Sequence, residues 1–218
     1  MNINNFVNRR ALRVFLKYFL ALIAPLIAIY FAVVVWRMVH FFNLDKTNAQ
    51  VERIHNARIS MADVMGENLP LDPKNDANTT IAGIDANKNG IRDDVELAIF
   101  NKYPNSAKVR APLLQYALAL EQEVNQKIVN MAIVTETVTE QSRAGRCLSN
   151  ELVPRVSPES PRSDADMEKI YEYIDFVKDK QFNTRERVTA RENFLKDLGS
   201  FGQSTNSECD INSALLPG

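Results

Sequence analysis

The stretch Tyr18–Trp36 reads YFLALIAPLIAIYFAVVVW and contains no charged residue. As an α-helix of about 19 residues it would extend roughly 28 Å, close to the thickness of the hydrocarbon core of a bilayer. Tyr18 and Trp36 stand at its two ends, where amphipathic aromatic rings favour the headgroup level, and Pro25 is tolerable in a membrane helix. We therefore expect residues 18–36 to form a transmembrane helix that contacts membrane lipid.

Two other interpretations of this stretch were weighed. A cleaved signal peptide has a shorter apolar region that ends in small residues suited to cleavage. Here the apolar run ends in VVVWR at residues 33–37, which is a poor cleavage site. We therefore favour an uncleaved signal anchor, with a buried core helix as the remaining alternative.

Charge is distributed unevenly around the apolar stretch. The whole chain has a net charge of -1, which does not indicate a nucleic-acid partner, yet residues 1–44 contain no Asp or Glu. Basic residues are dense before the stretch and sparser after it, where acidic residues are mixed in. Those before it are Arg9, Arg10, Arg13 and Lys17, and those after it are Arg37, Lys46 and Arg53 with Asp45 and Glu52. Because basic flanks stay inside, we expect residues 1–17 in the cytoplasm. The C-terminal part would then be periplasmic or otherwise extracytoplasmic, on a single-pass protein of the inner (cell) membrane.

Residues 37–80 are predicted to form a helical stalk followed by an irregular linker. Met38–Met65 contains neither Pro nor Gly and places apolar residues at helical spacing, so the membrane helix should continue outward. Two copies of the chain could pair through this stalk to form a homo-oligomer. Asn68–Thr80 carries Pro70 and Pro73 without apolar periodicity, which predicts an exposed linker.

The remainder, residues 81–218, shows helical periodicity and no strand alternation. We expect helices over 95–102, 107–148, 164–180 and 184–198, separated by polar or proline-containing segments. Asp164 and Asn183 are the expected caps of the last two helices. The prediction is an all-α protein with one transmembrane helix and a small antiparallel bundle.

Two cysteines, Cys147 and Cys209, lie far from the apolar stretch. Neither has a second cysteine or a histidine at the spacing of a zinc site. Two cysteines in an extracytoplasmic domain favour one disulfide, and two free buried thiols are the alternative.

A candidate metal site follows the linker. Asp85–Glu96 reads DANKNGIRDDVE and has the spacing of a twelve-residue calcium loop. In such a loop alternate residues direct oxygen atoms at one centre, and a glycine at the sixth position, here Gly90, allows a sharp turn. The predicted Ca²⁺ ligands are Asp85, Asn87, Asn89, the main-chain carbonyl of Ile91, Asp93 and Glu96. An ordinary Asn-rich surface turn is the alternative.

The loop resembles an EF-hand loop but departs from a regulatory one. Arg92 occupies the eighth position, where an apolar residue normally pairs two loops, and no clear amphipathic helix precedes Asp85. The loop is more similar to the aspartate-rich loops of thrombospondin type 3 repeats, and to single GIDxNxNGxRDDVE loops of uncharacterised bacterial envelope proteins. The resemblance covers Gly83–Glu96 and the helix after it, and it implies extracytoplasmic calcium binding without a specific activity.

The ligand charges indicate how such a site would work. Only Asp85, Asp93 and Glu96 carry full charges, so we expect weak affinity in the range of extracellular modules. Such a site stays filled where calcium is millimolar. A sensor would need a second, paired loop, so we expect a structural role.

The sequence argues against most kinds of catalysis. Histidine occurs only at His40 and His55, near the membrane, so no Ser-His-Asp or Cys-His arrangement can form in the bundle. No HExxH, GxSxG or glycine-rich phosphate loop is present. The remaining charged groups are interpreted as solvated helix faces, a helix N-terminus and surface ion pairs. They are Glu121 with Glu123, Asp164 with Asp166, and Arg185, Arg187 and Arg191 with Glu186 and Glu192.

We therefore expect a non-catalytic envelope module, anchored in the membrane and stabilised by calcium, that binds a protein partner. A calcium-responsive signalling subunit is the first alternative. A hydrolase of envelope glycans that uses only carboxylates is the second, and it would need two buried carboxylates in one pocket.

Overall fold

A computed structural model describes residues 9–157 and 159–217, with side chains placed from Leu12 onward. Within these residues the chain forms helices and no strand, so the predicted all-α fold is confirmed. The chain divides into two compact units, one ending at Asn48 and one covering Ala49–Gly218.

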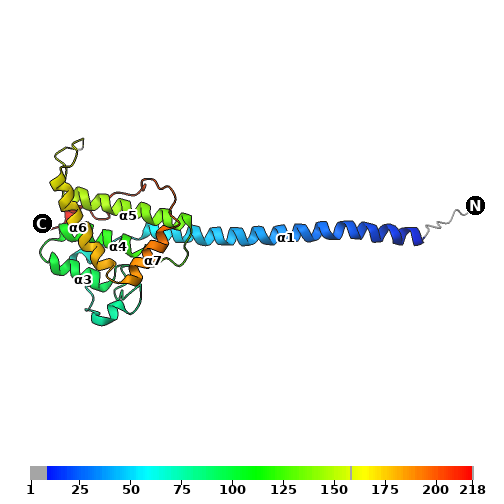
Figure 1. The fold of residues 1–218 in the computed structure, drawn as a ribbon, viewed down its shortest axis with the longest axis horizontal. Helices are drawn as coiled ribbons and strands as arrows, with labels where there is room; N and C mark the ends of the chain where they lie inside the picture. The colour runs from blue at the N-terminus through cyan, green and yellow to red at the C-terminus, as the bar shows by residue number, and fades with distance from the viewer. Residues whose placement is uncertain (1–8, 158, 218) are drawn as a thin grey trace, which may run out of the picture. The chain divides into compact units, whose positions relative to one another are not determined.

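The first unit is made by helix α1, Arg9–Asn56, which contains the whole apolar stretch and continues into the second unit (Figure 1). Most large apolar side chains of the apolar stretch are exposed, with Leu22 at 67%, Tyr30 at 65% and Trp36 at 69%. Among the described residues it is the one helix long and apolar enough to cross a membrane. Its most apolar window buries nothing, which argues against the interpretation as a core helix.

The membrane helix continues outward as predicted, but it ends at Asn56 and not at Met65, and a short helix α2, Met61–Met65, begins separately. Ser60 starts α2 with a reciprocal cap. Its hydroxyl accepts a hydrogen bond from the Asp63 amide, and the Asp63 carboxylate accepts one from the Ser60 amide at 2.7 Å. Around this break Ile54, Ile59 and Val64 are buried, so the segment packs within the second unit.

The linker that follows contains one turn of 3-10 helix, η1, Lys74–Asn78. The rest of the second unit consists of α3 (Asp93–Lys102), α4 (Ala107–Glu121), α5 (Met131–Leu152), α6 (Asp164–Gln181), α7 (Arg185–Leu195) and the 3-10 turn η2 (Ser213–Leu215). Helix α4 packs against α2, α3, α5 and α6, and nearly all of its side chains are buried (Figure 1). It is therefore the central helix of this unit.

The single long helix predicted over 107–148 is wrong, because α4 and α5 are separate helices joined by residues 122–130. The amides of Glu123 and Val124 turn back onto the carbonyls of Leu120 and Glu121. Asn130 then caps α5 by accepting a hydrogen bond from the Ile133 amide at 3.1 Å. The two helices can thereby pack against each other, which one continuous helix could not do.

Helices α6 and α7 lie close to their predicted ranges, but their caps are one residue away from the expected ones. Ser163 caps α6 in place of Asp164, and Thr184 caps α7 in place of Asn183. Each uses its hydroxyl to accept an amide hydrogen bond from the first turn.

The C-terminal tail is tied to α5 by the predicted cysteine pair, since Cys147 and Cys209 lie at disulfide distance with Cα atoms 5.1 Å apart. Beside this link, Asp210 is buried against the guanidinium of Arg143 at 2.8 Å. Arg143 also contacts Glu140 at 2.7 Å, and Arg58 reaches both carboxylates. We call Arg58, Glu140, Arg143 and Asp210 the tail network.

Candidate metal centre

The predicted loop makes a tight turn immediately before α3. The two carboxylate oxygens of Asp85 accept hydrogen bonds from the amides of Asn89 at 3.2 Å and Gly90 at 3.0 Å. Gly90 has a positive φ of 85°, and a Cβ built there would lie 2.7 Å from Leu118 of α4. The sixth position therefore requires glycine for both its backbone conformation and its close approach to the core.

Ile91, at the seventh position, anchors the loop to the core. Its side chain is fully buried, and its amide donates to the side-chain oxygen of Asn89 at 2.8 Å. The structure thus explains why an apolar residue follows the glycine. The role of its carbonyl as a calcium ligand stays a prediction.

Three of the predicted ligands meet at the carboxylate of Glu96, in the first turns of α3. Glu96 is only 1% exposed. Its two oxygens accept hydrogen bonds from the side-chain amide nitrogens of Asn87 at 3.0 Å and Asn89 at 3.1 Å. The third, fifth and twelfth positions are therefore adjacent. Each amide carries an oxygen on the same carbon as its nitrogen, so both side chains can present oxygen to a cation near Glu96.

Asp93, at the ninth position, is also buried, at 1% exposed, and begins α3. It accepts a hydrogen bond from the Ala86 amide at 3.0 Å, which fixes it on the inner side of the turn. Burial raises the pKa of Asp93 above its usual value, and the charges of Asp85 and Asp94 raise it further. Asp93 thus adds a second buried carboxylate to the loop.

The electrostatics of the loop favour a cation. Burial raises the pKa of Glu96 from 4.5 to about 7, although the hydrogen bonds from Asn87 and Asn89 oppose this. The neighbouring charges that act on Glu96 are those of Asp63 and Asp93, and both are carboxylates that raise its pKa further. A buried anion among other anions is costly unless an opposite charge is bound close to it.

The candidate ligand set consists of oxygen-bearing groups, which suits a hard cation such as calcium. Within residues 9–157 and 159–217, no three His, Cys, Asp or Glu side chains converge closely enough to form a metal cluster by themselves. The loop would instead combine carboxylates with amide and main-chain oxygens, a mixture that calcium accepts in proteins. The residues present therefore fit calcium better than zinc.

Arg92, which the sequence marked only as a departure from a regulatory EF-hand, is a fully buried anchor. It contacts Asp94 at 2.7 Å and donates to the carbonyls of Lys180 and Gln181 at the end of α6. The guanidinium of Arg92 therefore interacts with Asp94 and with the end of α6, and neither of these is among the predicted calcium ligands. The loop is tied through it to a distant helix.

The interpretation of Arg187 and Arg191 as members of surface ion pairs is wrong. Arg187 is fully buried and donates to the carbonyls of Ala77, Thr80 and Ile81, in the segment that leads into the loop. Arg191 pairs with Glu123 at 2.5 Å. Arg187 thus fixes the entry to the candidate site.

Glu121 and Glu123 are also buried, at 4% and 1% exposed, so their interpretation as a solvated helix face is wrong. Burial raises the pKa of Glu121 to about 7, and Asn125 and Gln181 donate hydrogen bonds to its carboxylate. Glu121 lines one cleft of the second unit, and Glu123 lines another. The two carboxylates therefore do not face one pocket, as paired hydrolytic groups would.

Comparison of the chain with models of protein families, with curated proteins and with solved structures found no match in any of the three. The likeness to EF-hand and thrombospondin type 3 loops therefore rests on residues 83–96 and the helix after them. The assignment of the loop as a calcium site depends on the geometry and charge of its residues.

Proposed function

We propose that this chain is a membrane-anchored, non-catalytic extracytoplasmic domain with a structural calcium site at Asp85–Glu96, acting as a protein-binding or assembly subunit of a cell envelope. Helix α1 supports the anchor. The basic residues before the apolar stretch support a cytoplasmic N-terminus in the inner membrane and a periplasmic domain. The cysteine pair supports an oxidising compartment.

The observation that carries the calcium proposal is the environment of Glu96. This carboxylate is buried and contacts the side-chain amides of Asn87 and Asn89, and the charges that raise its pKa are those of two other carboxylates, Asp63 and Asp93. Within residues 9–157 and 159–217, no basic side chain forms an ion pair with it. A divalent cation held by Asp85, Asn87, Asn89, Ile91, Asp93 and Glu96 would supply an opposite charge.

A structural role for the ion follows from how the loop is anchored. Ile91 is buried in the core and Arg92 is tied to α6, so the second half of the loop is fixed to the rest of the fold. A bound ion would hold the first turns of α3 to the segment before it. It would stabilise the surface that this unit presents to a partner protein, which affinity capture from solubilised membranes would identify.

The test is thermal unfolding of the whole chain in lipid nanodiscs, with calcium, with magnesium and with chelator. The whole chain is needed because Ile54, Ile59 and Val64, which precede residue 81, belong to the buried core. Calcium at ~100 times its dissociation constant should stabilise the fold by roughly 2.7 kcal/mol. Magnesium should do much less, since it requires octahedral geometry and retains its waters.

Matched variants make the test specific. Glu96→Gln removes a charged ligand while keeping helix propensity, so most of the calcium gain should disappear. Asn87→Ala should weaken the gain less, because a neutral ligand is lost. Lys88→Ala is the control, since position four of the loop points away from the metal. Residue 88 has a positive φ of 59°, which strains lysine and alanine equally, so the substitution itself does not change backbone strain. Identical melting of the wild type with calcium and with chelator would make the loop an ordinary turn.

A further inference from the structure

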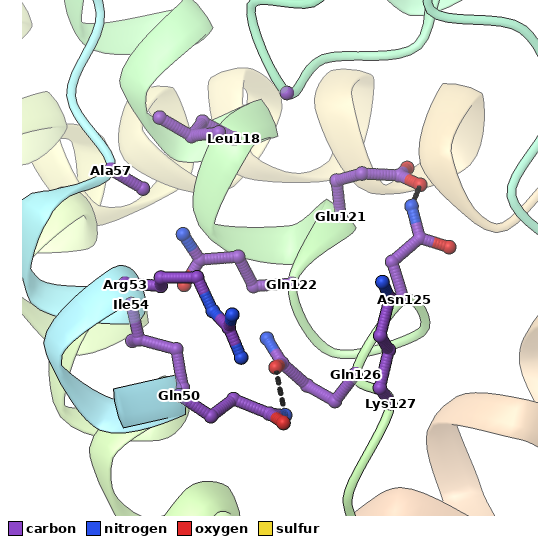
Figure 2. Close-up of a pocket in the computed structure, with 11 residues that line it drawn as sticks. Gln50, Arg53, Ile54, Ala57, Leu118, Glu121, Gln122, Asn125, Gln126 and Lys127 are labelled. Atoms are coloured by element: carbon purple, nitrogen blue, oxygen red, sulfur yellow. Dashed lines mark hydrogen bonds between the residues drawn. The ribbon is translucent and has the colours of Figure 1, made fainter. Parts of the chain in front are cut away.

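A cleft of about 340 Å³ opens on the second unit, between the last turns of α1, the end of α4 and the connection from α4 to α5 (Figure 2). This volume lies within the range of sites for small ligands. All of its lining residues except Gly90 lie outside the candidate metal loop.

Two amide oxygens of this cleft lack a hydrogen-bond donor. Gln50 is only 3% exposed, and its nitrogen donates to Gln126 at 2.6 Å and to the Ile128 carbonyl at 3.1 Å. Its side-chain oxygen is buried without a partner, and so is that of Gln122. Leaving such an oxygen unsatisfied is costly, and because both oxygens are shielded from solvent, the two side chains would rotate toward the cleft to accept a hydrogen bond from a ligand N–H group.

The charges that face the cleft are cationic. Arg53 and Lys127 line it, and within the described residues the side chain of neither makes a hydrogen bond or an ion pair. Figure 2 shows the Arg53 side chain extending from α1 toward the α4–α5 connection. The one acidic residue of the lining, Glu121, already accepts hydrogen bonds from Asn125 and Gln181. An anionic group, and a planar carboxylate in particular, would therefore be attracted to Arg53.

The apolar part of the lining is small. Ile54, Ala57 and Leu118 contribute it, and Ile54 and Leu118 are almost fully buried. Such a surface accommodates a small aliphatic group, whereas a sugar ring would place hydroxyl groups against it.

We infer that this cleft binds the free C-terminus of a peptide that ends in small aliphatic residues. The terminal carboxylate would contact Arg53 and Lys127, and main-chain N–H groups would donate to the oxygens of Gln50 and Gln122 once these two side chains rotate toward the cleft. The aliphatic side chain would lie against Ile54 and Leu118. A partner protein would then be recognised through its tail, which goes beyond the calcium proposal and does not depend on it.

The experiment measures binding of N-terminally labelled tri-alanine to the whole chain in nanodiscs by fluorescence anisotropy. Tri-alanine amide, which lacks the terminal charge, should bind ~10-fold more weakly or worse, a loss of about 1.4 kcal/mol. Arg53→Gln and Lys127→Gln should each weaken binding of the acid by a similar factor. Both side chains are exposed, so the fold should tolerate these changes. Arg185→Gln, an exposed arginine outside the cleft, is the matched control and should have no effect.

Titrations run in calcium and in chelator separate this proposal from the metal site. Binding of the acid in either buffer, with loss in Arg53→Gln, supports the cleft even if calcium has no effect on melting. Equal binding of acid and amide would overturn the proposal. So would unchanged binding in Arg53→Gln, or no binding of tri-alanine at concentrations of ~1 mM and above.

Discussion

Two regions of the second unit bury carboxylates to the same extent but differ in the charges that surround them. In the candidate metal loop, Asp93 and Glu96 are each 1% exposed. In the tail network, Glu140 is 3% exposed and the Asp210 side chain 1%. Burial of this degree is costly for a charged group unless an opposite charge lies beside it.

The tail network supplies that opposite charge from the chain itself. Burial alone would raise the pKa of Glu140, but hydrogen bonds from Ser204 and Arg143 and the charges of Arg143 and Arg58 hold it below its ordinary value. Glu96 has no such partner, and its pKa is raised to about 7. The comparison suggests that a fold provides a cation where a buried carboxylate has a purely structural role. For Glu96 no such cation lies among the described residues, which is why we propose that this carboxylate binds a metal ion.

Replacing Arg143 should leave the carboxylates of the tail network without their main cation, as Glu96 is in the candidate metal loop. Of the changes considered, this one should lower the free energy of unfolding most. Arg143→Met leaves Glu140 and Asp210 buried with only Arg58 nearby. Breaking a buried ion pair from one side costs roughly 3–5 kcal/mol. Chemical denaturation of the whole chain in detergent would measure the loss.

The control for that variant is Arg146→Gln on the same helix. Arg146 contacts Glu208 at 3.4 Å, and both side chains are about one-third exposed. An exposed pair of this kind contributes about 0–1 kcal/mol. Equal losses for the two variants would show that the buried network has no special role.

The disulfide tests whether the network depends on the covalent link to the tail. Cys147→Ala with Cys209→Ser opens a closed loop with a sequence separation of 62 residues. We expect a loss of about 2–4 kcal/mol in the unfolding free energy. A reducing agent should destabilise the wild type similarly and leave the double variant unchanged. Two thiols that are freely alkylated in the denatured, unreduced protein would contradict the link.

Glu121 is a buried carboxylate outside the candidate metal loop, so it shows what burial does to the pKa of a carboxylate. Burial raises its pKa from 4.5 to about 7, although the side-chain amides of Gln181 and Asn125 donate to it and, unlike at Glu96, the positive charges of Arg92 and Arg187 also lower the pKa. The folded chain therefore binds more protons than the unfolded chain between these pH values. The contribution of Glu121 to stability is consequently greatest below pH ~4.5 and is lost as the pH rises through ~7.

Glu121→Gln should remove this pH dependence and stabilise the fold at pH ~8 by about 1–2 kcal/mol, with little change at low pH. The side-chain oxygen of Gln181 has no partner and can accept a hydrogen bond from the new amide. Denaturation across the pH range measures the effect. Calcium should stabilise the variant and the wild type equally, and a calcium gain confined to the wild type would assign the ion to Glu121 instead of the loop.

Local patterns in the sequence predicted much of this molecule. The apolar stretch within α1, the ranges of α3 and α6 and the pairing of Cys147 with Cys209 follow from composition and spacing. The loop residues Asn87, Asn89 and Glu96 were expected to surround one point, and the structure places them together. These features depend on residues close together in the chain or on composition alone.

The features that could not be predicted depend on distant partners. The turn between α4 and α5 contains no Gly or Pro, so residues 122–130 look compatible with a continuous helix. Arg92 and Arg187 resemble surface residues in sequence, because the carbonyls that they contact lie far away in the chain. The burial of Glu121 and Glu123 likewise follows from packing around α4. The only local signal for the buried role of Arg92 is that an arginine occupies the eighth position of the loop, where an apolar residue is normal.

The most direct test of the calcium site is equilibrium binding of calcium to the whole chain, by dialysis against radioactive calcium. The account predicts one ion per chain, bound with the modest affinity of an extracellular module, and loss of this binding in Glu96→Gln. Magnesium at the same concentration should not displace the ion. Absence of calcium binding at concentrations of ~1 mM and above, or binding that persists unchanged in Glu96→Gln, would contradict the assignment of the loop as the calcium site.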